Sequence, residues 1–287
     1  MSGFADAEAM AWVNGELIQA GLATLPLLDH GITVGDGVFE AMKVVNGQAF
    51  AVTRHLRRME RSAAGLGIAF PGPSVVRQAI DELLAANQDL LTGPVDVVRV
   101  TLTAGIGRIG SGRLPGSKPS LFALVTSHGL EPAETAVITV PFSRNENGAL
   151  AGLKTTSYAA NALALAQAKA AGASEALFPN TRGLLTEGTG SNVFLVLDGT
   201  LVTPPLTDGA LGGVTRDLLL EWTGAAEQSV PMSALWEASE LFVTSTGRGV
   251  QAVTQIDGRV AGGGQIGPQT LAAREVFEAR AAESLDP

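Results

Sequence analysis

The sequence predicts a two-domain protein in which both halves mix helices and strands, of the α+β or α/β class. Three observations support this. Strand-like and helix-like segments occur on both sides of a Gly- and Pro-containing stretch at 128–134, and 287 residues suffice for two cores. No internal repeat or low-complexity tract interrupts them. We therefore expect a smaller domain over 1–127, a linker over 128–134 and a larger domain over 135–287.

The first half predicts hairpins, two helices and two longer strands. Asn46-Gly47 marks a hairpin turn between two apolar runs. Apolar residues recur at helical spacing over 54–66, and a second helix follows Pro73 with Ser74 as its expected N-cap. The expected elements are strands at 11–16, 17–20, 38–45, 48–52, 95–104 and 121–127, and helices at 54–66 and 74–87.

The second half predicts helices separated by short apolar strands. A helical run rich in Ala and Leu begins at Tyr158, directly after the segment Gly152–Ser157. The expected elements are strands at 137–142, 175–178, 192–197 and 240–244, a further segment around 250–256, and helices at 158–171, 215–222 and 268–280.

Composition excludes several classes of function. The formal charge is −9 and no basic run occurs, so we expect no nucleic-acid partner. The absence of cysteine excludes disulfides and thiolate zinc sites, and three scattered histidines predict no metal site. The start, Met1–Met10, is acidic and does not resemble a signal peptide, and no uncharged apolar run is long enough to span a membrane. We expect a cytoplasmic protein.

Lys154 is the first candidate for chemistry. It lies at the junction between a polar stretch and a helix, flanked by Gly152, Leu153 and small hydroxyl residues. Desolvation there would lower the pKa of the lysine and let the neutral amine attack a carbonyl. The alternative is a solvated loop lysine.

A phosphate site is predicted where glycines precede a helix. Gly212-Gly213 frees the backbone just before a helix that begins near Thr215, whose unpaired amides and hydroxyl would bind an anion. The alternative is an ordinary capped helix. A second cluster of hydroxyls and glycine closes a strand at 244–247, and Arg54 offers a fixed positive charge.

Two further segments carry charged candidates. Glu187 is expected in a turn just before a buried strand, where a carboxylate could hold a proton on a ring nitrogen. The alternative, which the motif by itself favours, is a turn carboxylate exposed to water. Gly105–Gly110 matches the spacing of a dinucleotide fingerprint, but no helix can start in the sequence that follows. We interpret this segment as a mobile loop whose Arg108 and Arg113 could reach a substrate carboxylate, or as a solvated basic loop.

Taken together, these residues resemble the class IV pyridoxal-phosphate enzymes of fold type IV. That family contains branched-chain and D-amino-acid aminotransferases, R-selective amine transaminases and aminodeoxychorismate lyase. The resemblance extends from Gly35–Glu40 to Gln265–Pro268, and its specific parts are Lys154, Leu184–Phe194 and Gly212–Arg216 in that order. It implies a small amino-terminal α/β sandwich and a larger barrel-like α/β domain.

The resemblance implies a role for each candidate. Lys154 would form the Schiff base with pyridoxal 5′-phosphate and later shuttle a proton, while Glu187 would pair with the pyridine nitrogen. Tyr158 would meet the ring hydroxyl. The phosphate ligands would be Arg54, the Val214 amide, Thr215, Ser245 and Thr246, and the substrate pocket would include Val34 and Phe39.

The resemblance leaves the reaction open between two activities. An aminotransferase would move an amino group from an amino acid or amine to a 2-keto acid, and we favour it. A lyase would release pyruvate and 4-aminobenzoate from aminodeoxychorismate, but Glu40 stands where a threonine is expected for that activity. A scaffold protein without cofactor is a third reading. The family also implies a homodimer.

Overall fold

The computed structural model describes residues 8–287, and the chain divides into two compact units. Unit 1 contains the chain up to Leu130 together with 153–158 and 285–287, and unit 2 contains 131–152 and 159–284. Residues 1–7, most of the segment used to judge a leader peptide, lie outside the described residues. The predicted domains differ from these units in two segments, 153–158 and 285–287, which belong to unit 1. The predicted linker, 128–134, is divided between the units after Leu130.

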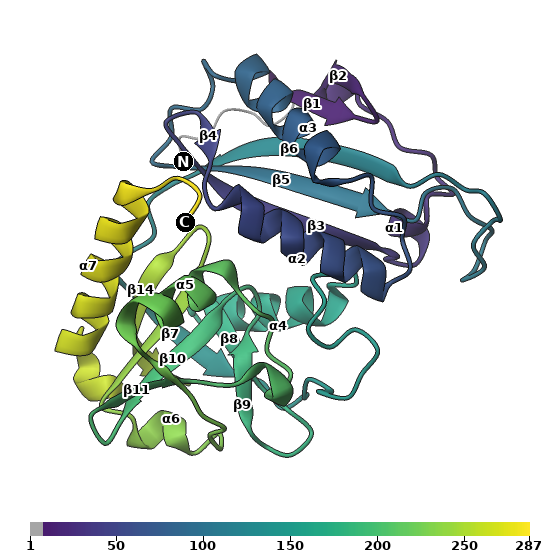
Figure 1. Cartoon of the computed structure of the whole chain (residues 1–287). Helices are drawn as coiled ribbons and strands as arrows, with labels where there is room; N and C mark the ends of the chain where they lie inside the picture. Colours follow the sequence, from purple (N-terminus) through teal and green to yellow (C-terminus); the bar gives the residue numbers. More distant parts are fainter. Residues whose placement is uncertain (1–7) are drawn as a thin grey trace. The chain divides into compact units, whose positions relative to one another are not determined.

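Unit 1 is built on a six-stranded antiparallel sheet in the order β2-β1-β6-β5-β3-β4 (Figure 1). Two helices, α2 and α3, pack against it and against each other. The strands are β1 (Met10–Val13), β2 (Glu16–Gln19), β3 (Gly37–Val45), β4 (Gln48–Ala49), β5 (Val95–Thr103) and β6 (Ser120–His128). The helices are η2 (Ala20–Leu22), α1 (His30–Thr33), α2 (Val52–Gly65) and α3 (Pro73–Ala86).

The core of unit 1 follows from the alternation of side chains along its strands. Val38 and Met42 are four residues apart on β3 and therefore share one face of the sheet. They join Leu56 and Met59 of α2 in one buried cluster. Burying each such side chain stabilises the fold by about 1.5–3 kcal/mol. The opposite face of β3 presents Phe39, which the site uses.

The start of α3 differs from the prediction. The helix begins at Pro73, Gly72 is its N-cap with φ 100°, and no side chain caps it. Ser74 therefore lies inside the first turn, so its predicted role as the cap was wrong. Proline at the first helical position needs no amide partner and already has a helical φ.

Unit 2 contains a nine-stranded mixed sheet in the order β12-β11-β10-β13-β14-β7-β8-β9, with β15 paired to β14. The strands are β7 (Glu134–Thr139), β8 (Glu175–Pro179), β9 (Leu185–Gly188), β10 (Asn192–Leu197), β11 (Thr200–Thr203), β12 (Ala226–Glu227), β13 (Glu240–Ser245), β14 (Gly249–Ile256) and β15 (Arg259–Val260). The helices are α4 (Ala159–Ala170), η3 (Leu206–Asp208), α5 (Val214–Thr223), α6 (Ala234–Glu237), η4 (Gly262–Gly264) and α7 (Pro268–Glu283).

The central strands of unit 2 are buried on both faces. In β10, Val193 and Leu195 belong to one apolar cluster, whereas Phe194 between them belongs to another. Phe194 stacks on Phe242 of β13 at 4.9 Å, on the side where α5 and α7 pack. Helix α7 runs beside β14 in Figure 1. Burial on both faces explains why the sequence of β10 is continuously apolar.

One predicted site residue has a different local structure. Glu187 was expected in a turn, but it is the third residue of β9, which pairs with β8. That prediction was wrong, because the strand state of 185–188 depends on β8 rather than on a local pattern. The mixed helix-and-strand class predicted for both halves is confirmed.

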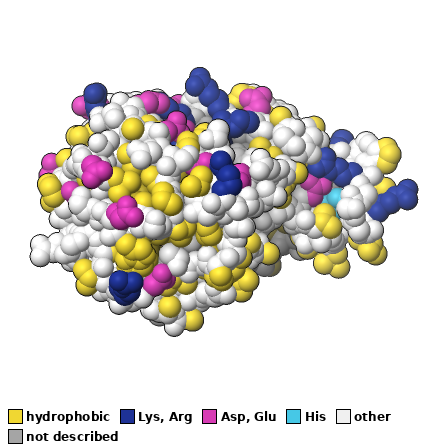
Figure 2. All heavy atoms as spheres, turned by 90° about the horizontal axis from the view of Figure 1, so that it is seen from below, with side chains coloured by type: hydrophobic (Ala, Val, Ile, Leu, Met, Phe, Trp, Pro, Cys, Tyr) yellow, Lys and Arg dark blue, Asp and Glu magenta, His cyan; other side chains and the backbone are white. Residues whose placement is uncertain are grey.

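The surface of the described chain mixes charges of both signs. On the face drawn in Figure 2, acidic and basic side chains are interspersed rather than gathered by sign. Among residues 8–287, no helix has both the length and the apolar composition required to cross a bilayer.

Candidate active site

Lys154 lies in a short segment of unit 1 that adds to the first half of β3. The Lys154 carbonyl accepts from the Phe39 amide at 3.1 Å, and the Thr156 amide donates to the Gly37 carbonyl at 2.8 Å. A β-bridge joins Thr155 to Val38, the residue between Gly37 and Phe39 on β3. A Cβ at Gly37 would lie 3.0 Å from the Thr156 hydroxyl oxygen, so glycine permits this close approach. The backbone of Lys154 is therefore fixed by the sheet.

The side chains around Lys154 gather on the ring of Phe39. The Lys154 Nζ lies 4.2 Å from the ring centroid, and the guanidinium carbon of Arg99 lies 3.8 Å from it. The ring of Tyr158 meets Phe39 edge-on at 5.3 Å. Phe39 is buried, whereas Lys154 and Tyr158 are half-buried. One aromatic ring thus carries two cations and a phenol, an arrangement stabilised by cation–π attraction.

A buried charged cluster lies on the helix side of β3. Glu40 accepts from His55 Nδ1 at 2.6 Å and from Arg58 Nε and Nη2 at 2.8 and 2.6 Å. His55 and Arg58 are three residues apart on α2 and therefore share a face. One turn further, the Ser62 hydroxyl accepts from the Lys154 amide at 3.1 Å. The cluster and the Lys154 segment are held by the same helix.

The charges in this cluster are set by burial and pairing. Burial alone would raise the pKa of Glu40, but the charge and hydrogen bonds of Arg58, helped by His55, lower it to about 2. Burial lowers the pKa of His55, and Glu40 offsets only part of that effect. Glu40 is therefore ionised at neutral pH and pairs chiefly with Arg58, while His55 is neutral.

Arg54 lies one turn before Arg58, at the beginning of α2. Its Nε donates to the Pro287 carbonyl at 2.8 Å, and the Thr53 amide donates to Asp286 at 2.8 Å. The last residues of the chain are thus fastened to this helix. Sequence reasoning chose Arg54 and missed Arg58. A glutamate inside the apolar strand 38–45 was the available signal for a buried cationic partner.

In unit 2, Glu187 is buried and held from two sides. Its Oε2 accepts from the Leu211 amide at 2.8 Å, and its Oε1 lies 3.2 Å from Arg144 Nε. The guanidinium carbon of Arg144 lies 4.3 Å from the ring centroid of Phe178. The carboxylate therefore has a fixed orientation and a counter-charge. Sequence reasoning did not find Arg144.

Asn192 connects Glu187 with the start of α5. Its Nδ2 donates to the carbonyl of Leu211, the residue whose amide binds Glu187, at 2.8 Å. Gly213 is the N-cap of α5, and a Cβ there would lie 2.0 Å from Asn192 Oδ1. No side chain caps this helix. The first amides, at Val214 and Thr215, therefore point from a helix end that favours an anion.

The end of β13 lies beside the same asparagine. Thr244 faces Asn192 in the ladder between β13 and β10, and Ser245 and Thr246 follow it. The Ser245 hydroxyl accepts from the Arg248 amide at 3.3 Å. The buried hydroxyl of Thr244 has no hydrogen-bond partner among residues 8–287. Unit 2 thus gathers amide and hydroxyl donors suited to a phosphate near a buried carboxylate suited to a protonated ring nitrogen, which is the polar pattern of pyridoxal phosphate.

A second buried carboxylate fixes the turn after Glu187. Glu175 accepts from the Thr189 amide and the Ser191 hydroxyl, each at 2.8 Å, and from the Thr189 hydroxyl. Gly188 lies so close that a Cβ there would be 2.9 Å from Glu175 Cδ. The turn between β9 and β10 is therefore tied to β8.

The remaining predicted pocket residues lie in and near the loop after β5. Arg108 is exposed, and its carbonyl receives a hydrogen bond from His30 Nε2 at 3.1 Å. Val34, at the end of α1, is 43% exposed. Arg113 is not free, because its Nη2 lies 2.6 Å from Asp36 Oδ1. No helix lies between Gly110 and β6, so this segment lacks the helix that a dinucleotide fingerprint requires.

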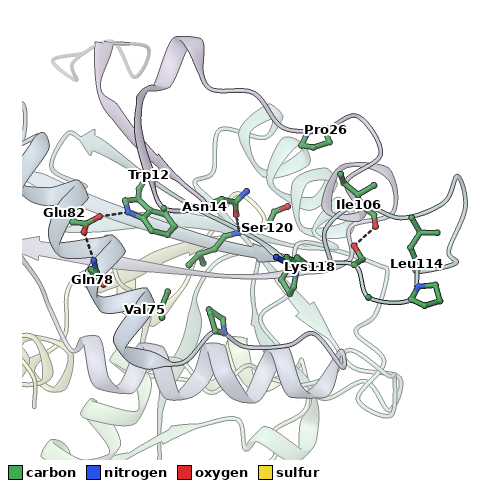
Figure 3. Close-up of a pocket in the computed structure, with 17 residues that line it drawn as sticks. Trp12, Asn14, Pro26, Val75, Gln78, Glu82, Ile106, Leu114, Lys118 and Ser120 are labelled. Atoms are coloured by element: carbon green, nitrogen blue, oxygen red, sulfur yellow. Dashed lines mark hydrogen bonds between the residues drawn. The ribbon is translucent and has the colours of Figure 1, made fainter.

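A groove of about 930 Å³ on unit 1 is separate from this chemistry (Figure 3). Trp12 donates its indole N–H to Glu82 at 2.7 Å on one side, and Lys118 lies in its wall. Neither Lys154 nor Phe39 lines it. We therefore do not place the active site in this groove.

Comparison with known proteins decides the family. The model of the amino-transferase class IV family matches residues 37–256. The chain belongs to this family. A putative branched-chain-amino-acid aminotransferase of Methanocaldococcus jannaschii is 30% identical over 275 residues, covering 93% of this chain and 94% of that protein. A D-alanine aminotransferase of Staphylococcus haemolyticus is 30% identical over 288 residues, covering 93% and 95%.

Solved structures of aminotransferases share the fold. A branched-chain aminotransferase of Thermoproteus uzoniensis, crystallised with norvaline, superposes with a TM-score of 0.86 at 27% identity, covering 94% of this chain and 93% of that one. A hypothetical aminotransferase of Mycobacterium tuberculosis, in its PLP-bound form, gives a TM-score of 0.82 at 26% identity, covering 94% of this chain and 98% of that one.

These comparisons confirm the predicted family, fold, enzyme class and cofactor. The protein is a pyridoxal-phosphate-dependent aminotransferase of fold type IV. Nothing in the comparisons favours the lyase.

Proposed function

We propose that the protein transfers an amino group from an amino acid to a 2-keto acid, with Lys154 as the residue that binds the cofactor aldehyde covalently. The observation that carries this is the fixed position of Lys154, whose amide and carbonyl are both bonded and whose Nζ lies against Phe39. A lysine held beside an aromatic ring is suited to covalent catalysis on a carbonyl. Bound pyridoxal phosphate would supply the electron sink.

The chain's own groups would then divide the work. Lys154 Nζ would move a proton from the α-carbon of the donor. Glu187, oriented by Leu211 and Arg144, would accept the hydrogen bond of the pyridine N–H and keep that nitrogen protonated. Tyr158 is proposed as the partner of the ring hydroxyl.

Phosphate binding is proposed at the start of α5 and the end of β13. The donors would be the Val214 and Thr215 amides, the Thr215 hydroxyl, Ser245 and Thr246. Arg54 remains the proposed cation. Arg58 is a second candidate, since Glu40 holds its guanidinium rigidly on the helix that supports Lys154.

A cation for the substrate carboxylate is proposed at Arg99. It is exposed beside Phe39, and within residues 8–287 it has no hydrogen bond or ion pair. Arg108 remains a second candidate, and Phe39 and Val34 are proposed to line the pocket. The relatives are named for branched-chain amino acids and D-alanine, so we propose a small aliphatic amino acid as donor.

The assembly and location are also proposals. We propose a homodimer in the cytoplasm, in line with the family resemblance and the cysteine-free sequence. A molar mass near twice 29.4 kDa in light scattering would support the dimer.

The test of the proposed function is chemical labelling followed by assay. The protein, loaded with pyridoxal phosphate, is reduced with borohydride and its peptides are analysed by mass spectrometry; the label is expected on Lys154. Lys154→Ala should lose both label and turnover, while Lys169→Ala, an exposed lysine on α4, keeps both. A label on another lysine, or turnover retained in Lys154→Ala, refutes the assignment.

The same preparation distinguishes the reactions. Leucine, valine and D-alanine are offered as donors with 2-oxoglutarate or pyruvate as acceptor, and aminodeoxychorismate is supplied in a parallel reaction. Formation of the matching keto acid is expected. Release of 4-aminobenzoate without transamination would instead support the lyase.

A further inference from the structure

Arg113 joins three segments of unit 1 through one guanidinium. Its Nε and Nη2 donate to the two carboxylate oxygens of Asp36 at 2.7 and 2.6 Å. Its Nη1 donates to the Gly67 carbonyl at 3.0 Å and its Nη2 also to the Leu66 carbonyl at 2.8 Å. The third segment is the loop between β5 and β6 that carries Arg113 itself.

The bonds of Arg113 suit the chemistry of each partner. Leu66 is the C-cap of α2, and carbonyls at a helix C-terminus lack intrahelical partners and attract a cation. The pKa of Asp36 is lowered, mainly by the hydrogen bonds from Arg113. An isolated surface ion pair contributes little, but a planar fork that bonds four times also fixes geometry.

Both partners of Arg113 support the segment that contains Lys154. At the end of α2, a Cβ on Gly65 would lie 2.7 Å from a methyl carbon of Leu153, so the helix packs directly against the residue before Lys154. Asp36 follows Gly35, whose carbonyl accepts from the Thr156 and Ser157 hydroxyls, each at 2.9 Å.

The loop itself is anchored at its two sides and free at its tip. The Arg108 carbonyl is bonded by His30, and the Ser117 hydroxyl donates to the Ile106 carbonyl at 2.6 Å. Between them Ile109 is 90% exposed, and Gly110 has φ 98°. Arg113 follows this tip in the chain, and its side chain bonds Asp36 and the end of α2, which both contact the segment that contains Lys154.

We infer that Arg113 is a positioning residue for transamination: its fork fixes the end of α2 and the Asp36 turn relative to each other, and so fixes Lys154 and Tyr158. In this inference the Arg113 side chain does not bind the substrate carboxylate, although its position in a loop had suggested that role. The inference rests on the proposed role of Lys154.

The test compares kinetics of Arg113→Gln, Arg113→Lys, Asp36→Asn and the double variant Arg113→Gln with Asp36→Asn. Lys118→Gln is the control, because it removes one positive charge from the same loop. At saturating cofactor we expect kcat to fall about tenfold in each Arg113 or Asp36 variant, with KM for the donor changed less than about twofold. Arg113→Lys should not rescue, since an ammonium lacks the fork.

The kcat of the double variant should fall no further than that of either single variant, because each single substitution already breaks the Arg113–Asp36 ion pair. Lys118→Gln should stay within about twofold of the parent enzyme. A large rise in KM at constant kcat would show that Arg113 binds substrate. Parent-like kcat, or multiplying losses in the double variant, would also overturn the inference.

Hydrogen exchange tests the coupling without any turnover. In Arg113→Gln, the amides of 153–158 should exchange faster at a temperature where thermal melting shows the protein folded. Unchanged exchange there overturns the inference even if activity falls. If borohydride labels no Lys154 in the parent protein, the proposed function fails instead, and the exchange result still decides whether Arg113 holds this segment.

Discussion

Replacing Glu40 with glutamine tests the charge of the buried cluster behind Lys154. The Glu40 carboxylate is fully buried and bonded by Arg58 and His55. A carboxyl whose pKa falls from 4.5 in the unfolded chain to about 2 in the folded one contributes about 3 kcal/mol to the free energy of unfolding. Because this pKa is lowered by folding, the contribution is present above pH 4.5 and is lost as the pH falls toward 2.

Two further effects set the expected size of the change. Glutamine would leave the buried guanidinium of Arg58 without its counter-charge, so the cost at pH 7 should be about 3–5 kcal/mol. The pKa of His55 is lowered in the folded state, so below pH 6.5 the unfolded chain binds the proton more readily. This adds to the loss of stability of the parent protein in acid.

The assay measures urea unfolding at several pH values between pH 7 and pH 3. Hydrogen exchange of the amides in β3 and α2 is the readout, so that only the unfolding of unit 1 is measured. The gap in the free energy of unfolding between the parent protein and Glu40→Gln should narrow by about 2 kcal/mol between pH 7 and pH 3, because pH 3 is still above the folded-state pKa of Glu40. Glu60→Gln, an exposed position on α2, should stay within about 0.5 kcal/mol of the parent. A gap of equal size at pH 7 and pH 3 would refute the claim that an ionised Glu40 stabilises the fold.

Two glycine substitutions give further expected outcomes. Gly213→Ala would place a Cβ 2.0 Å from Asn192 Oδ1 and displace the start of α5, so cofactor affinity in a fluorescence titration should weaken about tenfold or more. Gly190→Ala, with open space around its Cβ, is the control, and equal affinity in both variants would count against a phosphate site at α5. Gly107→Ala would press a Cβ to 1.8 Å from the ring of His30, and urea unfolding of unit 1 should show a loss of about 1–3 kcal/mol. An unchanged midpoint would contradict this.

Local patterns predicted the elements whose cause is local. The helix over 54–66 was found because its apolar residues repeat every three to four positions, and the structure has α2 at Val52–Gly65. The hairpin at Asn46-Gly47 was found because both residues can adopt positive φ, and they have φ 50° and 76°. Candidate residues for binding the cofactor could be named because the glycines in their motifs mark places where the backbone must approach a ligand closely.

The features that sequence reasoning missed depend on distant partners. Strand β9 has four residues and no alternating pattern, and it exists because it pairs with β8. The segment 153–158 belongs to unit 1 because it bonds to β3, more than a hundred residues earlier in the chain. The ion pair of Arg113 could not be predicted, because the residues around a loop arginine show nothing of Asp36, 77 residues away; the sequence left Arg113 either near a substrate carboxylate or solvated in its loop.

Two buried carboxylates, Glu40 in unit 1 and Glu175 in unit 2, each orient a segment next to a proposed catalytic residue. Each costs free energy to bury, and each recovers it through several donors: charged ones around Glu40, and amides and hydroxyls around Glu175. An apolar group of similar volume that replaced the whole Glu40–Arg58 pair could fill that space at no loss of stability. What it could not do is fix direction. Glu40 orients the face of α2 that bonds Lys154, and Glu175 ties down the turn that follows Glu187, so the directional bonds of each carboxylate act on a proposed catalytic residue rather than on packing alone.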